Sequence, residues 1–400
     1  MFFSPKIQQA FTYCQTPCYV FDQDAVRDRV SYVRSMLPEG TNICYAMKAN
    51  PFVLDSAYRC CEAIEVCSPG EFDICQRLGV PVAKLVISGV NKTEHFIQRV
   101  VNESNPVRCI TVESENQLAL IEASARQANK IIPVLLRLTS GNQFGIDEQT
   151  LVMLASKVLH SPNLILKGVQ YFPGTQKHSV KRFKRELAAL DELLARLSAL
   201  ETDVKLELEY GPGLPIEYCD QEVNNCHEEL LMSLADELRS LTFSGPVTLE
   251  MGRFLAALCG VYLTRVVDTK CNDGQRYAII DGGKHQITYY GPSLAFKSPV
   301  FSVLQGHENT PAEDWCICGS LCTVGDVLVK QAHIKRLEIG DTLAFHNAGA
   351  YCATEGMSLF LSRDLPRIYL IDSQGIPQLV RSSIETSAFN TPLLQQEKSK

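Results

Sequence analysis

Short apolar runs rich in β-branched residues alternate with longer amphipathic stretches through the first 255 residues. The eight runs are Ile43–Ala49, Ala63–Ser68, Lys84–Gly89, Val107–Ser114, Ile132–Leu138, Leu166–Phe172, Lys205–Gly213 and Pro246–Gly252. The helical stretches between them include Glu94–Val101, Glu115–Gln127, Leu151–Leu159, Val180–Leu200 and His227–Leu241. Strands that are apolar on both faces and alternate with helices indicate a parallel sheet. Eight such units predict an α/β fold, a closed (β/α)8 barrel over residues 23–255.

The pattern changes after Arg253, where short strands are separated by Gly, Pro, Asn and Asp. These strands are Val261–Thr269, Tyr277–Asp281, Ile287–Tyr290, Trp315–Gly319, Leu343–Phe345 and Arg367–Leu370. They predict an all-β domain over residues 256–385. Residues 1–22 contain a further strand at Thr16–Asp22, which we expect to join that domain. The polar residues 386–400 predict a disordered tail.

Composition and charge narrow the class of protein. A hydrophobic fraction of 46% and a charged fraction of 21% are typical of a globular chain with a core. The net charge of -7 and the lack of a clustered basic face argue against a nucleic-acid partner, because phosphate binding needs such a face. The short Lys181–Lys184 stretch is interpreted as a solvated helix start.

The N-terminal residues show no secretory signal, and no apolar run of about 18 residues predicts a membrane span. Sixteen cysteines in a chain without an export signal favour reduced thiols in the cytoplasm over a disulfide framework. Neither the pair Cys14 and Cys18 nor the group Cys316, Cys318 and Cys322 has zinc-ligand spacing around it. We therefore expect buried thiols and no metal site.

Candidate chemistry follows from what ends each barrel strand, because functional residues of such barrels lie at the C-terminal strand ends. Lys48 ends the first run, although a lone lysine there can simply extend to the barrel rim. The loop Gly211–Gly213 after the seventh run lets the backbone approach an anion, although Gly-Pro-Gly is also ordinary turn sequence. Glu250 and Arg253 end the eighth run and can bind a ligand or each other.

Together these strand ends fit one cofactor, pyridoxal phosphate (PLP). A PLP site needs a lysine for an imine, groups that bind the phosphate, and a partner for the pyridine nitrogen. Lys48 can supply the first, the Gly211–Gly213 loop with Arg253 the second, and Glu250 the third.

At these residues the chain resembles the PLP-dependent decarboxylases with an alanine racemase-like barrel, which include ornithine, arginine and diaminopimelate decarboxylases. The likeness runs from about Pro17 to Leu370. Tyr45-Ala46-Met47-Lys48-Ala49-Asn50 is similar to the family's lysine motif, which makes Lys48 the Schiff-base residue. Glu250-Met251-Gly252-Arg253 is similar to its Glu-Pro-Gly-Arg segment, which implies Glu250 at the pyridine nitrogen and Arg253 near the phosphate. Gly174-Thr175 resembles its Gly-Ser, so the Thr175 hydroxyl is expected at the phosphate.

Two more motifs of the resemblance lie in the predicted β domain. The segment Gly319–Asp326 resembles the family's Gly-Pro-x-Cys-x-x-x-Asp, which implies that Cys322 enters the neighbouring subunit's site and protonates the product. Gly349-Ala350-Tyr351 resembles the Gly-Ala-Tyr that places a tyrosine, here Tyr351, near the phosphate. The resemblance therefore implies a homodimer with shared active sites, and a glutamate with a cysteine favours decarboxylation over racemisation.

Two positions depart from the family. Phe172 stands where the family has a histidine that stacks on the cofactor ring, and an aromatic face can still stack there. Thr323 follows the cysteine where decarboxylases of free ornithine or diaminopimelate carry Asp or Glu. A buried substrate ammonium without a carboxylate partner binds poorly, unless another acid such as Glu355 substitutes.

The segments Leu321–Thr323, Asp281–Gln286 and Phe360–Ser362 are similar to a branch that makes siderophores and other secondary metabolites, with citryl-diaminopropionate decarboxylases as the nearest resemblance. That branch acts on amino acids already joined to a larger acid. Lys284, His285 and Arg363 would then bind citryl carboxylates, and ordinary surface charge is an equal interpretation of these three.

Two alternatives stay open. The substrate can be a free basic amino acid such as ornithine, lysine or diaminopimelate. The chain can also be an inactive regulatory homologue, as antizyme inhibitors are to ornithine decarboxylase. Retention of Lys48, Glu250, Arg253 and Cys322 together argues against inactivity.

Overall fold

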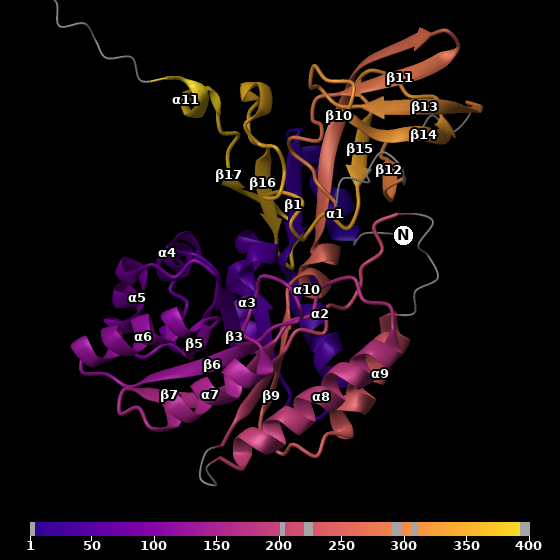
Figure 1. Cartoon of the computed structure of the whole chain (residues 1–400). Coiled ribbons are helices and arrows are strands. Elements are labelled where there is room, and N and C mark those ends of the chain that lie inside the picture. The colour runs from indigo at the N-terminus through magenta and orange to yellow at the C-terminus, as the bar shows by residue number, and fades with distance from the viewer. Residues whose placement is uncertain (1–4, 201–204, 220–226, 290–297, 306–309, 393–400) are drawn as a thin grey trace, which may run out of the picture. The chain divides into compact units, whose positions relative to one another are not determined.

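The computed structural model describes residues 5–200, 205–219, 227–289, 298–305 and 310–392. The chain divides into two compact units (Figure 1). The barrel unit comprises residues 26–216 and 225–255, and the β unit comprises residues 1–25, 217–224 and 256–400. Within the described residues, none of the helices is long and apolar enough to cross a membrane.

The barrel unit contains eight parallel strands that close into a barrel in sequence order. They are β2 (Asn42–Ala46), β3 (Ala63–Val66), β4 (Leu85–Ile87), β5 (Cys109–Val112), β6 (Ile132–Leu138), β7 (Leu164–Tyr171), β8 (Glu207–Tyr210) and β9 (Val247–Met251). The barrel closes where β9 pairs with β2, with Thr248 opposite Asn42. The predicted (β/α)8 barrel is therefore confirmed. Most strands end earlier than predicted, because the residues that follow them turn into loops.

Helices follow the strands (Figure 1). They are α2 (Gln23–Met36), α3 (Leu54–Cys60), α4 (Pro69–Arg77), α5 (Glu94–Val101), α6 (Glu115–Gln127), α7 (Glu148–Leu159), α8 (Val180–Ser198), α9 (His227–Arg239) and α10 (Arg253–Ala256). Among the described residues, five of them begin at a side chain that accepts a hydrogen bond from the first turn, namely Asp22, Ser68, Thr93, Ser114 and Asp147. The cap at Asp147 explains why α7 begins three residues before the predicted Leu151.

The barrel interior is layered because side chains two residues apart on a strand share a face. Near the start of the strands, Glu207 accepts hydrogen bonds from Arg108 and Thr248. The next layer is apolar and contains Cys44, Ala63, Val86, Cys109 and Leu135. Two residues further along β3, β8 and β9, a layer of buried carboxyl groups follows at Glu65, Glu209 and Glu250.

The β unit contains a nine-stranded sheet in the order β14-β13-β11-β10-β1-β16-β17, with β12 and β15 beside it. The strands are β1 (Cys18–Asp22), β10 (Gly260–Asn272), β11 (Gln275–Ile280), β12 (Phe301–Val303), β13 (Ala312–Cys318), β14 (Val327–Lys335), β15 (Thr342–Phe345), β16 (Arg367–Ile371) and β17 (Pro377–Arg381). The N-terminal β1 lies between β10, which is antiparallel to it, and β16, which is parallel. The helices α1 (Pro5–Ala10) and α11 (Ser387–Asn390) belong to the same unit.

Two of the segments that the sequence singles out in the β unit differ from the prediction. The strand predicted at Ile287–Tyr290 is wrong for residues 287–289, because Thr288 bonds to a loop carbonyl at Cys352 instead of a strand ladder; Tyr290 lies outside the described residues. The predicted disordered tail begins with α11, held where Asn390 donates to the carbonyl of Leu359 at 2.9 Å, and residues 393–400 lie outside the described part. Every cysteine that the structure describes is a free thiol.

Candidate active site

Lys48 lies at the C-terminal end of β2, in a single 3-10 turn (Met47–Ala49), instead of inside the strand. Met47 and Ala49 are buried beside it, whereas the Lys48 side chain is 39% exposed. Its Nζ lies 2.5 Å from Glu65 Oε2 and 3.6 Å from Glu250 Oε1. The amine is therefore reachable at the barrel mouth and held between two buried carboxyl groups.

These two carboxyl groups differ in pKa. Burial raises the pKa of Glu65, but the charge of Lys48 and its hydrogen bond outweigh burial, so the pKa lies below its ordinary value. Burial and the neighbouring Glu65 charge raise the pKa of Glu250 to about 7, although Lys48 opposes the shift. Near neutral pH, Glu65 is thus the ionised partner of Lys48, and Glu250 can carry a proton.

A third buried carboxyl group, Glu209 of β8, shares a hydrogen-bond donor with Glu250. Gln170 of β7 donates from Nε2 to Glu209 Oε1 at 2.7 Å and to Glu250 Oε2 at 3.2 Å. Burial and the charge of Glu250 raise the pKa of Glu209 to about 8. Gln170 therefore fixes the orientation of Glu250 through one amide.

The glycine loops after β7 and β8 lie against each other. Gly213 has a φ of +61°, and a Cβ there would lie 2.1 Å from the carbonyl oxygen of Gly174. A Cβ on Gly211 would lie 2.1 Å from the ring of Phe172. Only glycine fits these two positions, so the loops present bare backbone. Phe172 and Thr175, both half-buried, flank this backbone, and the Phe172 ring packs on Gly211.

Arg253 begins α10 directly after β9 and is buried, three residues beyond Glu250. Seven of the residues singled out in the sequence lie in the barrel unit: Lys48, Phe172, Thr175, Gly211, Gly213, Glu250 and Arg253. A reachable amine, a buried carboxyl group with a raised pKa and two bare loops fit the amine, nitrogen and phosphate requirements of PLP.

The remaining predicted residues lie in the β unit. Cys322 and Thr323 are exposed on the turn between β13 and β14. Asp326, only 2% exposed, anchors this turn, because its carboxylate accepts the backbone N–H groups of Leu321 and Lys284, each at 2.8 Å. The motif's aspartate therefore shapes the cysteine turn.

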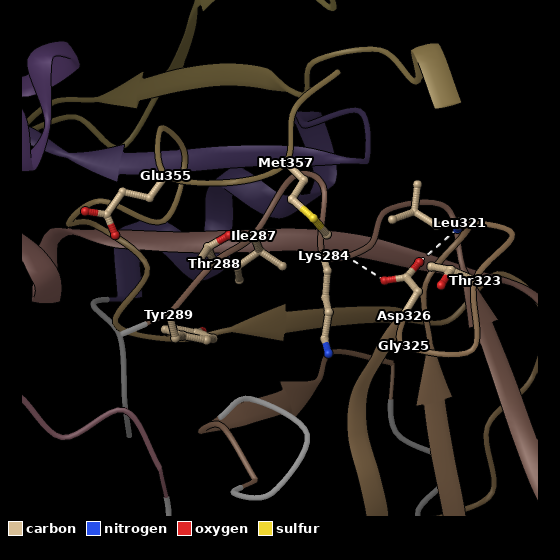
Figure 2. A pocket seen from close by; sticks show the side chains of 10 residues that line it. All are labelled: Lys284, Ile287, Thr288, Tyr289, Leu321, Thr323, Gly325, Asp326, Glu355 and Met357. Atoms are coloured by element: carbon tan, nitrogen blue, oxygen red, sulfur yellow. Dashed lines mark hydrogen bonds between the residues drawn. The ribbon is translucent and has the colours of Figure 1, made fainter. Parts of the chain in front are cut away.

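A pocket of about 300 Å³ adjoins that turn (Figure 2). Lys284, Thr323 and Glu355 line it, and Leu321 and Met357 contribute apolar surface. Figure 2 shows the Lys284 amine pointing away from the Asp326 carboxylate, with Glu355 and Thr323 on opposite sides of Lys284 in that view.

Four predicted residues of the β unit, Cys322 among them, do not belong to the set that lines this pocket. His285 is buried, and Arg363 donates to the carbonyl of Ser320 at 2.8 Å. Tyr351 has a φ of +66° in the turn after β15 and is half-buried. Of the three proposed citryl contacts, only Lys284 lines the pocket.

Sequence reasoning missed Glu65, Gln170 and Glu209. A signal was available for Glu65, because it is a polar residue in an otherwise apolar run, as Lys48 is, whereas Gln170 and Glu209 share their runs with other polar residues. Glu65 in Ala63-Ile64-Glu65-Val66 is the clearest case.

The chain is similar to known proteins over most of its length. Residues 23–257 match the family described as pyridoxal-dependent decarboxylase, pyridoxal binding domain. L-glutamyl-[BtrI acyl-carrier protein] decarboxylase of Niallia circulans is 27% identical over 396 residues, covering 92% of this chain and 91% of the relative. The 2-[(L-alanin-3-ylcarbamoyl)methyl]-2-hydroxybutanedioate decarboxylase of Staphylococcus aureus is 26% identical over 415 residues, covering 92% and 98%.

Diaminopimelate decarboxylase of Aquifex aeolicus is 25% identical over 356 residues, covering 84% of this chain and 82% of the relative. The crystal structure of diaminopimelate decarboxylase from Helicobacter pylori complexed with L-lysine aligns with a TM-score of 0.83 at 22% identity, covering 95% of this chain and 97% of that one. This structural likeness shows the shared fold. Because the match at residues 23–257 spans more than half of the chain, the protein belongs to the pyridoxal-dependent decarboxylases, a family of PLP enzymes.

Proposed function

We propose that this decarboxylase removes the α-carboxylate of an amino acid that is joined to a larger acid, such as a citryl-diamino acid in siderophore biosynthesis. The observation that carries the proposal is the pair Lys284 and Thr323 lining the pocket beside Cys322. A cation and a hydroxyl suit an anionic or neutral distal group better than an ammonium.

One acid that lines the pocket, Asp326, already accepts hydrogen bonds from two backbone N–H groups. A free diamino acid would place its distal ammonium in the pocket and need a carboxylate there. Asp326 lines the pocket, but two backbone N–H groups occupy its carboxylate and it is almost fully buried. Thr323 supplies no charge, and Lys284 repels a cation.

Glu355 supports the second candidate, a decarboxylase of free ornithine, lysine or diaminopimelate. Its exposed carboxylate also lines the pocket and can pair with an ammonium. The relatives include both kinds of substrate: two have names that describe an amino acid joined to another group, and one is named for diaminopimelate.

The residues of the barrel unit would hold PLP. Bound PLP supplies an electron sink for the electron pair that remains when the α-carboxylate leaves as carbon dioxide. Lys48 would bind it through its amine, and Glu65 orients that amine by accepting its hydrogen bond. Glu250 would face the pyridine nitrogen with a proton that its raised pKa keeps available near neutral pH. Backbone at Gly211 and Gly213, with Thr175, Arg253 and Tyr351, would bind the phosphate, and Phe172 would lie against the ring.

Cys322 would protonate the product carbon. Its thiol is exposed on a turn that Asp326 holds in shape, so the S–H can be presented to a substrate as a general acid. The proposal includes a cytoplasmic homodimer in which Cys322 of one subunit completes the active site of the other.

The direct test is carbon dioxide release from citryl-diaminopropionate compared with free ornithine, lysine and diaminopimelate. We expect kcat/KM to be at least about 100-fold higher for the conjugate, because Lys284 attracts the citryl carboxylates and repels a distal ammonium. Equal or higher activity on a free diamino acid would overturn the conjugate proposal and favour the Glu355 alternative. No release from any of them would contradict both candidates.

A further inference from the structure

We propose that Gln176 and the buried Lys177–Glu186–Tyr210 network are positioning groups that hold the two phosphate loops of the barrel together. The inference rests on the proposed role of the loops at Thr175 and Gly211–Gly213 in binding the cofactor phosphate. It concerns how these loops are kept in place, since neither Gln176 nor Lys177 is assigned to the phosphate itself.

Gln176 joins the loop after β7 to the loop after β8. Its Nε2 donates to the carbonyl of Ile216 at 2.9 Å, and its Oε1 accepts the N–H of Ile216 at 2.8 Å. One side-chain amide thus satisfies both backbone groups of a single residue, as a neighbouring strand would. We call this pair of hydrogen bonds the Gln176 clasp.

The residue that makes this contact, Gln176, has a strained backbone conformation. Its φ is +54°, a region that residues with a Cβ rarely adopt. Such strain persists only where surrounding contacts require it, and it gathers at binding sites. Gln176 directly follows Thr175, so the strain lies next to the proposed phosphate ligand.

Lys177 makes a second connection between the loop after β7 and the loop after β8. Its backbone N–H donates to the carbonyl of Gly213 at 2.9 Å. Its Cε lies only 3.1 Å from the place where a Cβ on Gly213 would be. The lysine therefore both hydrogen-bonds to the Gly213 turn and packs against it.

The Lys177 amine is not available to a ligand. Its side chain is 1% exposed, and Nζ lies 2.7 Å from Glu186 Oε2 and 3.3 Å from the hydroxyl of Tyr210. Tyr210 also donates to Glu186 at 2.6 Å, and Arg182 reaches the other oxygen of Glu186 at 2.8 Å. Burial lowers the pKa of Lys177 to about 8, although Glu186 opposes this shift.

This network ties together three elements around the loops. Glu186 and Arg182 belong to α8, Lys177 to the loop before α8, and Tyr210 ends β8 directly before Gly211. Because bare backbone can bind an anion well only when its N–H groups are fixed in direction, such bracing sets phosphate affinity.

The test compares PLP with pyridoxal, which lacks the phosphate, for binding to the full-length chain freed of cofactor. Fluorescence titration gives a dissociation constant for each ligand in the wild type, in Gln176→Ala and in Lys177→Met/Glu186→Gln. Gln98→Ala is the matched control, because within the described residues the Gln98 side chain bonds to Glu94 of the same helix, α5. We expect both loop variants to weaken PLP binding by about tenfold while pyridoxal binding stays within about twofold.

The outcomes separate the inference from the function on which it rests. A wild type that binds PLP and pyridoxal equally would overturn the proposed phosphate loops and the inference with them. A wild type that prefers PLP, with the same preference kept in both variants, would overturn the inference alone. If Gln176→Ala does not fold, Gln176→Gly removes the same clasp while suiting the positive φ, and it is judged by the same ratio.

Discussion

Lys48 donates a 2.5 Å hydrogen bond to Glu65, a carboxylate that is 2% exposed and lies on the neighbouring strand β3. The contact follows from barrel register, because Glu65 pairs with Ala46, two residues before Lys48. The barrel therefore gives the lysine a buried anionic partner that differs from the acid proposed for the cofactor nitrogen, Glu250. Two acids with opposite pKa shifts can divide two tasks, orienting an amine and carrying a proton.

Replacing Lys48 should abolish both cofactor attachment and activity. Lys48→Ala removes the amine that would bind PLP, so we expect the visible absorbance of the bound cofactor to disappear and carbon dioxide release to fall by at least about 1,000-fold. Lys157→Ala, which changes an exposed lysine of α7, is the control and should alter neither. A variant that kept the absorbance would show that another residue attaches the cofactor.

Neutralising Glu65 should change the pH dependence of the enzyme. Glu65→Gln keeps the side-chain shape but removes the charge that raises the pKa of Glu250. We expect kcat/KM to fall by about tenfold, because the Lys48 amine loses its ionised partner. The limb of the pH–rate profile that Glu250 governs should also move to lower pH. An unchanged profile would mean that Glu65 has no influence on the site.

How far the sequence predicts this molecule depends on whether a feature is local. The helices α5 and α6 have the predicted bounds, because each shows an amphipathic pattern and begins at a capping residue. Lys48 and Glu250 were identifiable because each interrupts an apolar run. By contrast, the pairing of Lys48 with Glu65 depends on which strands become neighbours.

Loop contacts were the least predictable part. Gln176 and Ile216 are 40 residues apart, and nothing in either segment indicates that one amide joins them. The strand prediction for residues 287–289 was wrong for the same reason, since an apolar run can be satisfied by a loop such as the one at Cys352. Packing between distant loops decides such cases.

Glu209 should make the cofactor-free protein less stable at high pH. Its pKa in the folded state is raised to about 8 from an ordinary value of 4.5, so the folded protein holds the proton more tightly than the unfolded chain. This contribution is complete below pH 4.5 and is lost as the pH rises through about 8. Glu209→Gln mimics the protonated group and should retain on the order of 3 kcal/mol more of its stability between pH 5 and 9.

Urea unfolding at both pH values measures this difference. Glu192→Gln, at an exposed position of α8, is the control and should follow the wild type. If Glu209→Gln loses as much stability as the wild type on going to high pH, Glu209 is ionised at a lower pH than its surroundings imply.

Asp326 should matter for the cysteine turn and not for the cofactor. Asp326→Asn leaves one oxygen to accept the two backbone N–H groups of Leu321 and Lys284. We expect a stability loss of about 1–2 kcal/mol and a lower kcat, with the absorbance of bound cofactor unchanged. Asp314→Asn, at an exposed position of β13, is the control. A loss of cofactor absorbance in Asp326→Asn alone would contradict a role confined to the turn.

Thr323 should decide between conjugated and free substrates. Thr323→Glu adds a carboxylate to the pocket that Lys284 also lines, where a distal ammonium could pair with it. We expect kcat/KM for free diaminopimelate to rise by about tenfold relative to the citryl conjugate, because the charge now matches the free diamino acid and repels citryl carboxylates. Val324→Glu places the same charge one residue further on, at a fully exposed position that does not line the pocket, and should leave the ratio unchanged. If both variants shift the ratio equally, long-range charge explains the effect; if neither does, the pocket does not receive the distal end of the substrate.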